Sequence, residues 1–516
     1  MTQVLRSWWL IACAAVMSSS ALLADVTGSI LGVVTDPTAA VVQGVQITAT
    51  NVDTNLVTET TTDSAGQYRL LSLPIGRYKL QATFSGFQTY VATGIVLSVD
   101  EQRRVDIVLN VGATQQEVSV SASAVQVETT NTQLGEVIDE KKILELPLLG
   151  RRYLDLFGLQ PGVAPAGTRG EGPGTISVNG QRENSNGFLV NGGDVSGAAN
   201  FEAGVQPNLD AVQEFRLITN GFDAEYGRFS GALMNAITKS GTNKIHGAAF
   251  EFLRNDKMDS RGFFDPAKGA LKKNQFGYAV GGPAFKDKLF WFTDYQGDRQ
   301  VNAGTASEVQ VLSLAERQGN VGVQNLSGTV TGSYWAQVLS KRLARQVQVD
   351  EPYSAVFPDG IIPTSAFSPA TNGTIGFIPT PNAGDNIFAS AAVSKKSIDH
   401  KVGQRVDFLN KSTGNWSGYY YFDDFSRLDP YGASSFPTGF GSDDRDRNQL
   451  GTLSNTHIFS PMAVNDFRLS YTRLVARSVP AGSVAPSLES MGFITGAGTL
   501  GINNAGPTGG FRIRTP

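Results

Sequence analysis

Cysteine and histidine are scarce in this sequence. One cysteine, Cys13, occurs among 516 residues, and the three histidines, His246, His400 and His457, lie far apart. Neither an HExxH nor an HxxE spacing is present, which excludes the usual zinc hydrolase sites, and a lone cysteine cannot build a disulfide framework. We therefore expect no metal, no cofactor and no catalytic constellation, so the chain is not expected to be an enzyme.

Charge and long apolar runs are scarce as well. Charged residues make up 17% of the chain and the formal net charge is -4, which disfavours a nucleic-acid binder. No stretch reaches the ~18 apolar residues of a transmembrane helix, although barrel strands would give only a weak, alternating signal. Residues 1–24 predict a signal peptide, with Arg6 before the apolar run Trp8–Met17 and cleavage before Asp25. Cys13 would leave with it.

Glycine, in contrast, is abundant, with 57 residues, and turn signals separate many short alternating strands. Over residues 26–111 such strands recur about every 8–12 residues, which is typical of a β-sandwich. Tyr68, Leu70, Tyr78 and Leu80 fall on alternating positions and are predicted to face its core. This module resembles the carboxypeptidase regulatory-like domain, a transthyretin-like sandwich grouped with carbohydrate-binding-like folds. The resemblance implies no peptidase activity, because the zinc ligands are missing.

Residues 136–241 carry an ordered set of motifs. They are Leu146-Pro-Leu-Leu-Gly-Arg151, Ile176-Ser-Val-Asn-Gly-Gln-Arg182, Phe188-Leu-Val-Asn-Gly-Gly-Asp194, Glu225-Tyr-Gly-Arg-Phe-Ser-Gly231 and Asn235-Ala-Ile-Thr-Lys-Ser-Gly-Thr242. Strand-like runs are expected at 215–218 and 232–238. In this order the motifs closely resemble the mixed α/β plug domain of TonB-dependent outer-membrane receptors. Charged residues beside the expected strand ends are candidates for contacts that hold a plug in its barrel: Arg151, Arg182, Glu225 and Arg228.

Residues 112–135 form an expected linker without large aromatic residues. Within it Glu117, Val118, Ser119, Val120 and Ser121 alternate apolar and small polar side chains, a pattern able to add a strand to a partner's sheet edge. Because the segment lies just ahead of the plug-like motifs, it resembles the TonB box, and TonB would then be the periplasmic partner. A plain linker is the alternative.

From residue 242 to 516 the apolar period is two. One face of each expected strand is apolar or aromatic and the other small or polar, as in a barrel with lipid outside and a wet lumen. Phe250 and Phe252 are placed on the outward face by this pattern, as are Tyr278, Tyr420 and Tyr471. The stretch 281–292 resembles the barrels of Oar-like receptors. Residues 300–397, with helix-like runs at 313–317 and 335–349, are expected to be a large extracellular loop.

The fold class expected is mainly β: a transthyretin-like β-sandwich, a mixed α/β plug domain and antiparallel strands of an incomplete transmembrane β-barrel. Some 7–9 strands fit after residue 242, whereas this family closes its barrel with about 22. We therefore expect either a truncated chain or a barrel fragment that cannot insert into the membrane alone. The resemblance implies a TonB-dependent receptor in the outer membrane, in contact with its lipid, with the first module periplasmic. The substrate is not identified by the sequence, and an oligosaccharide, a peptide and an iron chelate all remain open. The alternative is a surface adhesion or structural β protein without transport.

Overall fold

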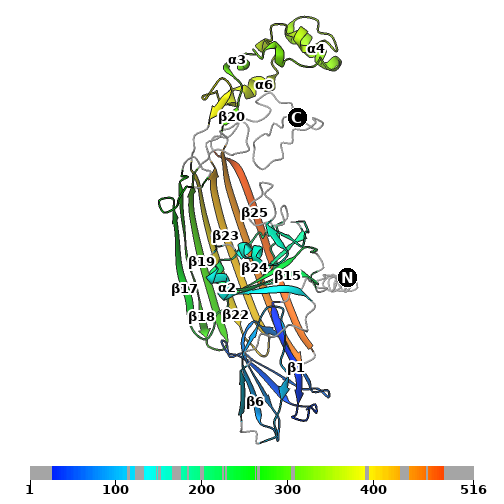
Figure 1. The fold of residues 1–516 in the computed structure, drawn as a ribbon, viewed down its shortest axis with the longest axis vertical. Helices are drawn as coiled ribbons and strands as arrows, with labels where there is room; N and C mark the ends of the chain where they lie inside the picture. Colours follow the sequence, from blue (N-terminus) through cyan, green and yellow to red (C-terminus); the bar gives the residue numbers. More distant parts are fainter. Residues whose placement is uncertain are drawn as a thin grey trace, which may run out of the picture.

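The fold has four parts, of which three follow one another along the long axis of the molecule and one lies against the middle of a sheet of long strands (Figure 1). The computed structural model describes residues 26–112, 117–121, 133–146, 148, 151, 153–165, 176–182, 185–197, 203–222, 226, 229–261, 263, 268–303, 308–389, 394–429, 441–460 and 463–481. We call residues 26–121 the N-terminal module, residues 133–241 the central module, and strands β17 to β25, without the short strands β20 and β21, the long-strand sheet. A spur formed by residues 308–389 extends beyond the end of the sheet that lies away from the N-terminal module.

The N-terminal module consists of two sheets that share one core. Its strands are β1 (Thr27–Thr35), β2 (Gln46–Asn51), β3 (Val57–Thr61), β4 (Gln67–Pro74), β5 (Gly76–Thr83), β6 (Thr89–Leu97), β7 (Gln102–Arg104), β8 (Ile107–Val108) and β9 (Glu117–Ser121). In the described residues one sheet has the order β4-β1-β7, with β8 also on β1, and the other β3-β2-β5-β6-β9. The predicted core residues Tyr68, Leu70, Tyr78 and Leu80 are all buried, which confirms that expectation.

The central module surrounds a small mixed sheet of order β10-β15-β16-β13-β14. Its elements are β10 (Leu134–Asp139), α2 (Glu140–Glu145), the 3-10 helix η1 (Tyr153–Leu159), β11 (Val163–Pro165), β12 (Ile176–Val178), β13 (Gly187–Val190), β14 (Gly193–Asp194), the 3-10 helix η3 (Leu209–Ala211), β15 (Val212–Asn220) and β16 (Leu233–Thr238). The strand runs predicted at 215–218 and 232–238 correspond to β15 and β16. Asp139 caps α2 by accepting a hydrogen bond from the Lys142 backbone N–H.

The long-strand sheet is antiparallel, and its strands pair in chain order. They are β17 (His246–Asn255), β18 (Leu271–Phe285), β19 (Leu289–Asn302), β22 (Lys395–Phe408), β23 (Asn415–Asp429), β24 (Gly441–Ser460) and β25 (Ala463–Ala481). These seven strands, counted within the described residues, each have 10 to 20 residues. A tilted strand needs about 9–11 residues to cross a bilayer, so each is long enough to do so.

One face of the long-strand sheet packs on the central module, and we call it the inner face. Tyr419, Tyr421 and Leu450 of this face belong to the hydrophobic core of the central module. On the opposite, outward face, Tyr420 and Tyr471 are among the exposed large hydrophobic residues. The outward placement of Tyr420 and Tyr471 is therefore confirmed, whereas the inner face of β23, expected to be small or polar, carries the buried Tyr419 and Tyr421.

Strand β17 departs from that expectation. Ala248 pairs with Ala279, and Ala279 packs against Ala211 of the central module, so these alanines lie on the inner face. Because side chains two residues apart share a face, Phe250 and Phe252 lie on the inner face too. The prediction that they face outward was wrong. Their rings instead contact the guanidinium of Arg151 from the central module, as described below.

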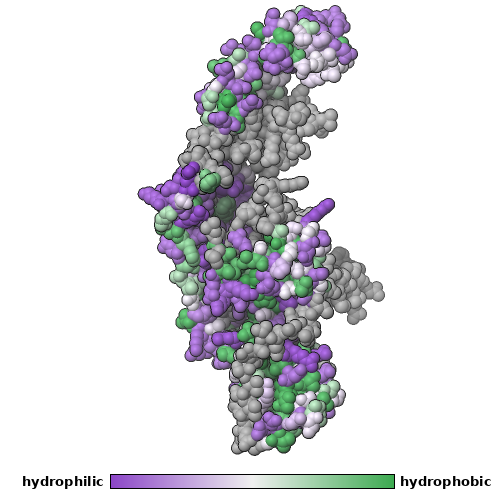
Figure 2. All heavy atoms as spheres, viewed as in Figure 1, coloured by the Kyte–Doolittle hydropathy of each residue, from purple (hydrophilic) through white to green (hydrophobic). Residues whose placement is uncertain are grey.

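The spur carries small helices and a separate small core. Its elements are β20 (Glu308–Gln310), α3 (Leu314–Arg317), η5 (Val323–Asn325), α4 (Gly332–Leu343), α5 (Tyr353–Val356), η6 (Thr364–Ala366), α6 (Pro369–Thr374), η7 (Ile375–Phe377) and β21 (Ile387–Ala389). The run predicted at 335–349 begins earlier and ends at Leu343, because Ala344 adopts a left-handed conformation. The visible face of the spur is mostly hydrophilic (Figure 2). Among the described residues, no helix has both the length and the apolar character needed to cross a membrane.

Candidate functional site: the junction of the three parts

The segment Glu117–Ser121, predicted from sequence to be a coupling element, is an edge strand. As β9 it pairs in parallel with β6, with Thr89 opposite Glu117 and Thr93 opposite Ser121. It is therefore the last strand of its sheet within the described residues. Its backbone hydrogen bonds are made to β6 of the same module.

The N-terminal module is docked on the central module by two charged side chains of β15. Glu214 accepts a hydrogen bond from the Val99 backbone N–H. Arg216 donates from Nη1 to the backbone oxygens of Val99 at 3.1 Å and of Asp100 at 2.9 Å. Both side chains are buried. The 98–101 turn is thus held by an acceptor and a donor that project from the same strand.

Burial governs the charge state of Glu214. Burial raises the pKa of its carboxyl to about 7, and the neighbouring Glu101 also raises it. The Val99 N–H and the Arg216 guanidinium act in the opposite direction, since both favour the ionised form. The carboxyl consequently changes charge near neutral pH while it is in contact with a second module.

A second contact joins the N-terminal module to the turn between β18 and β19. The Asn55 side-chain amide donates to Asp287 Oδ1 at 2.9 Å. The Asn243 backbone N–H donates to the Asp53 carbonyl oxygen at 2.9 Å, and its side-chain amide donates to the same Asp287 at 2.6 Å. Asn243 lies between the central module and β17, so this contact joins the N-terminal module, the β18–β19 turn and the segment that follows the central module.

Arg151 joins the central module to β17. Its guanidinium pairs with the Asp210 carboxylate, and both side chains are about nine-tenths buried. Its Cζ also lies 4.4 Å from the Phe250 ring centroid and 4.3 Å from that of Phe252. Burial lowers the pKa of the guanidinium, an effect that Asp210 opposes. Stacking of a guanidinium on aromatic rings stabilises the cation where it is partly desolvated.

The other sequence candidates do not join this contact. Arg182 lies in the turn after β12, where its side chain is exposed and makes no ion pair with any described residue. Glu225 and Arg228 lie outside the described residues.

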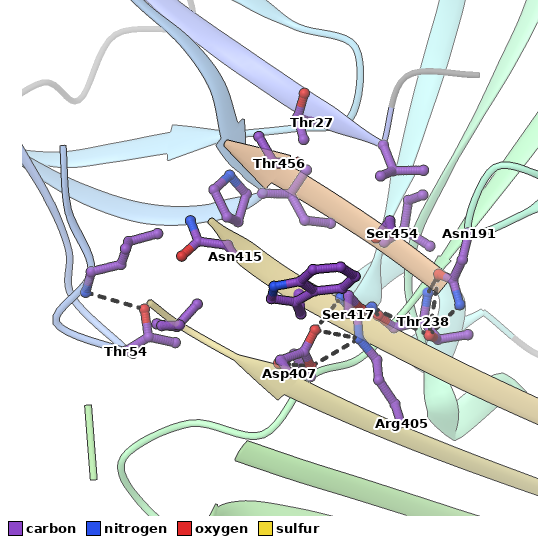
Figure 3. Close-up of a pocket in the computed structure, with 18 of the residues that line it drawn as sticks. Thr27, Thr54, Asn191, Thr238, Arg405, Asp407, Asn415, Ser417, Ser454 and Thr456 are labelled. Carbon is purple, nitrogen blue, oxygen red and sulfur yellow. Dashed lines mark hydrogen bonds and ion pairs between the residues drawn. The ribbon is translucent and has the colours of Figure 1, made fainter. Parts of the chain in front are cut away.

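A polar network fastens the end of β16 to β22 (Figure 3). Arg405 donates from Nη1 to the Thr238 carbonyl oxygen at 2.6 Å and pairs with Asp407, with 3.0 Å between Nε and Oδ2. Asp407 accepts from Ser240 Oγ at 2.7 Å, and the Thr238 backbone N–H donates to Asn191 Oδ1 at 3.0 Å. Two motifs of the central module and one strand of the sheet are thereby linked.

Sequence reasoning found the motif that contains Thr238 and Ser240 but missed Arg405 and Asp407. The available signal was their spacing, because residues i and i+2 of a strand share a face. A cation and an anion on the same inward face of a strand, such as Arg405 and Asp407, then indicate that a polar group of another element packs against that face.

Gly241 shows why the last motif of the central module contains glycine. A Cβ at this position would lie 2.4 Å from the Trp291 carbonyl oxygen and 2.6 Å from that of Gly282. The chain that leaves the central module therefore runs directly against the backbones of β18 and β19, where only glycine fits.

A small cavity lies where the three parts meet (Figure 3). Its volume is about 130 Å³, and Asn51 of the N-terminal module, Gln213 of the central module and Trp416 of β23 contribute to its walls. Ligand sites usually measure about 300–1,000 Å³. The cavity is therefore suited to a few water molecules rather than to a substrate.

The chemistry of this junction is noncovalent. The described residues contain no cluster of three or more His, Cys, Asp or Glu that could hold a metal ion. The arrangement positions backbone strands and charged pairs between three parts of one chain. These contacts attach the N-terminal module and the central module to each other and to the sheet.

Comparison with known proteins identifies two regions. Residues 237–515 match the model of the outer membrane beta barrel domain, which is more than half of the chain. Residues 29–110 match the carboxypeptidase regulatory-like domain. The latter agrees with the resemblance seen in the sequence of the N-terminal module.

Among curated proteins, the chain is 28% identical over 332 residues to the TonB-dependent transporter Oar of Myxococcus xanthus. The match covers 59% of this chain and 30% of that relative, so the chain spans about a third of the relative's length. The relative is a transporter, in agreement with the expectation of a protein without enzymatic activity.

Solved structures of outer-membrane proteins also align with the chain. The outer membrane transporter YddB of Escherichia coli aligns with a TM-score of 0.43 and 10% identity, over 67% of this chain and 40% of its own. A mutant form of the ferric enterobactin receptor PfeA of Pseudomonas aeruginosa aligns with a TM-score of 0.39 and 12% identity, over 69% and 42%. The family match rests on the domain models, and by them this chain belongs to the outer membrane beta barrel domain family, with a carboxypeptidase regulatory-like domain at its N-terminal side.

Proposed function

We propose that the chain is part of a TonB-dependent outer-membrane transporter of the Oar type, with an unidentified substrate. In this proposal the N-terminal module is a periplasmic transthyretin-like sandwich and the central module is the plug of a barrel. The long-strand sheet forms the part of the barrel wall against which the plug rests. The spur extends outside the cell.

The observation that carries this proposal is the shared interior of the central module and the sheet. Tyr419, Tyr421 and Leu450 of the sheet pack in the same hydrophobic core as Phe188 and Phe215 of the central module. A module that fills the inner side of barrel-type strands is what a plug requires. The polar network around Arg405 adds a second attachment, which is reversible because it depends on hydrogen bonds and one ion pair.

Glu117–Ser121 would be the segment that TonB engages. A partner that adds a strand needs free backbone groups in an extended segment. Since β9 pairs with β6 on one side only within the described residues, its other edge could receive TonB before β9 leaves the sheet. A pull on β9 would then exert force on the contacts that hold the central module against the sheet. Arg151 is the main candidate for such a contact, and Arg182, Glu225 and Arg228 are further candidates.

Site-specific cross-linking tests this proposal directly. The only cysteine is Cys13, so a single introduced cysteine is unique in a chain that has lost residues 1–24. We expect Ser119→Cys in the full chain to form a disulfide with a cysteine placed in the strand-adding segment of TonB. Glu59→Cys on β3, the opposite edge of the same sheet, is the matched control and should not react.

Deletion of Glu117–Ser121 separates transport from adhesion. Loss of cross-linking and of TonB-dependent growth on outer-membrane-impermeant nutrients, with the chain still in the membrane, would support transport. A deletion strain that behaves like the parent strain, together with equal cross-linking at positions 59 and 119, would refute the proposal and favour an adhesion protein.

A further inference from the structure

The outward face of β22 to β25 contains an apolar hollow. Its volume is about 520 Å³, and it is a shallow depression that is open on the outward side. Two registered rows of side chains cross the four strands here. One row is Val406, Gly418, Leu453 and Leu469, and the neighbouring row is Gln404, Tyr420, Gly451 and Tyr471.

Two glycines create the hollow. A Cβ added to Gly418 or Gly451 would meet no atom within 4 Å, and neither residue has a left-handed backbone. Elsewhere in the sheet glycine makes room for close contacts: a Cβ at Gly277 would lie 2.1 Å from the Tyr295 carbonyl oxygen. Glycine weakens a strand. At these two positions neither the backbone conformation nor a close neighbouring atom requires it. What the two glycines provide is the space itself.

A polar rim closes one end of the hollow. The Gln449 amide donates to the Tyr420 hydroxyl at 2.8 Å, and Arg473 Nη1 donates to Gln449 Oε1 at 3.3 Å. Gln449 and Arg473 are directly paired across β24 and β25, on the outward face. Among the residues that the structure describes, no carboxylate forms an ion pair with Arg473. A guanidinium is therefore presented beside the apolar hollow.

The membrane supplies the surroundings of this face, because the chain belongs to an outer membrane barrel family. The outward side chains directly before Arg473 on β25 are those of Phe467, Leu469 and Tyr471, which are large, hydrophobic and exposed. Such an outward apolar stretch is what a barrel presents to lipid tails. The hollow lies within this stretch, and Arg473 follows directly after it on the strand.

We infer that this hollow binds one membrane lipid with a phosphate headgroup. One acyl chain lies over Gly418 and Gly451, between the side chains of Tyr420, Leu453 and Tyr471. The phosphate accepts hydrogen bonds from Arg473, a donor whose fork geometry suits phosphate oxygens. Lipid tails are as apolar as leucine, so the selectivity for this site comes from close packing in the hollow and from the charge at its rim.

Native mass spectrometry of the full chain in detergent, with added phosphatidylglycerol, tests the inference. We expect the wild-type chain to retain one phosphatidylglycerol. Gly418→Val and Gly451→Val fill the hollow and should lower the retained fraction about tenfold. Both variants are expected to fold, because valine favours strands and meets open space. Arg473→Gln should weaken retention of phosphatidylglycerol but not of a diacylglycerol with the same chains.

Two control variants change the same face outside the hollow. Val475→Ile adds a methylene on β25, and Arg445→Gln removes an outward charge that pairs with Asp443 at 3.0 Å. Both should retain lipid as the wild type does. Equal retention by Gly451→Val and the wild type would overturn the inference. So would a self-associated dimer that Gly451→Val dissolves, since a second copy of the chain would then occupy the hollow.

Discussion

We predict that Glu214 makes the docking of the N-terminal module dependent on pH. The perturbation is Glu214→Gln, which keeps an oxygen acceptor for the Val99 N–H but cannot ionise. In the docked state, burial raises the pKa of the Glu214 carboxyl from its ordinary value of 4.5 to about 7. The docked state therefore holds the proton more tightly than a state in which the carboxyl meets water.

Proton linkage gives the direction and the size of the pH dependence of docking. Between pH 4.5 and about 7 the docked form binds more protons, so docking is strongest below 4.5 and weakens as the pH rises to about 7. A pKa difference of about 2.5 units corresponds to about 3 kcal/mol, or about two orders of magnitude in the docking equilibrium. Above about pH 7 the dependence ends.

Hydrogen exchange at the Val99 amide measures this equilibrium, because that N–H donates to Glu214 in the docked state. After correction for the intrinsic exchange rate, protection should fall from pH 5 to pH 7.5 in the wild type. In Glu214→Gln it should stay constant. Glu136→Gln is the matched control, since that carboxylate is half exposed on β10, and it should leave the wild-type slope unchanged. A flat wild-type profile, or an equal slope in Glu214→Gln, would refute the reasoning.

Three further changes address the attachment of the central module to the sheet. Arg405→Ala leaves Asp407 buried without its ion-pair partner, and we expect a loss of about 3 kcal/mol, measured as earlier release of the central module in urea-dependent proteolysis. Arg151→Lys keeps the charge but loses the planar stack on Phe252, so we expect a loss of about 1 kcal/mol in the same assay, and an unchanged midpoint would contradict the stacking argument. Gly241→Ala brings a Cβ against backbone oxygens and should cost about 2 kcal/mol, seen as a lower thermal midpoint.

Much of the modular order was readable from the sequence. The alternation of Tyr68, Leu70, Tyr78 and Leu80 predicted the core of the N-terminal module, since a period of two assigns side chains to one face of a strand. The motifs of the central module pointed to β15 and β16. The glycine of the Thr-Lys-Ser-Gly motif was visible too, although its reason, a close approach to the backbones of β18 and β19, was not.

Contacts between distant segments could not be read in this way. Arg151 was a candidate from its motif, but its partners Asp210, Phe250 and Phe252 come from separate stretches of chain. Arg182, in an equally charged motif, lies exposed. A charge beside a strand end does not determine which element packs over it, because that depends on how the modules dock.

The sequence by itself determined which residues of each long strand share a face. Only the tertiary structure decided which face meets the central module. Tyr420 of β23 and Tyr471 of β25 face outward, whereas Phe250 and Phe252 of β17 turn inward to the guanidinium of Arg151. The physical reason is that alternation with a period of two sorts the side chains onto two faces but does not say which face is the inner one. That is decided by the element that packs over the face.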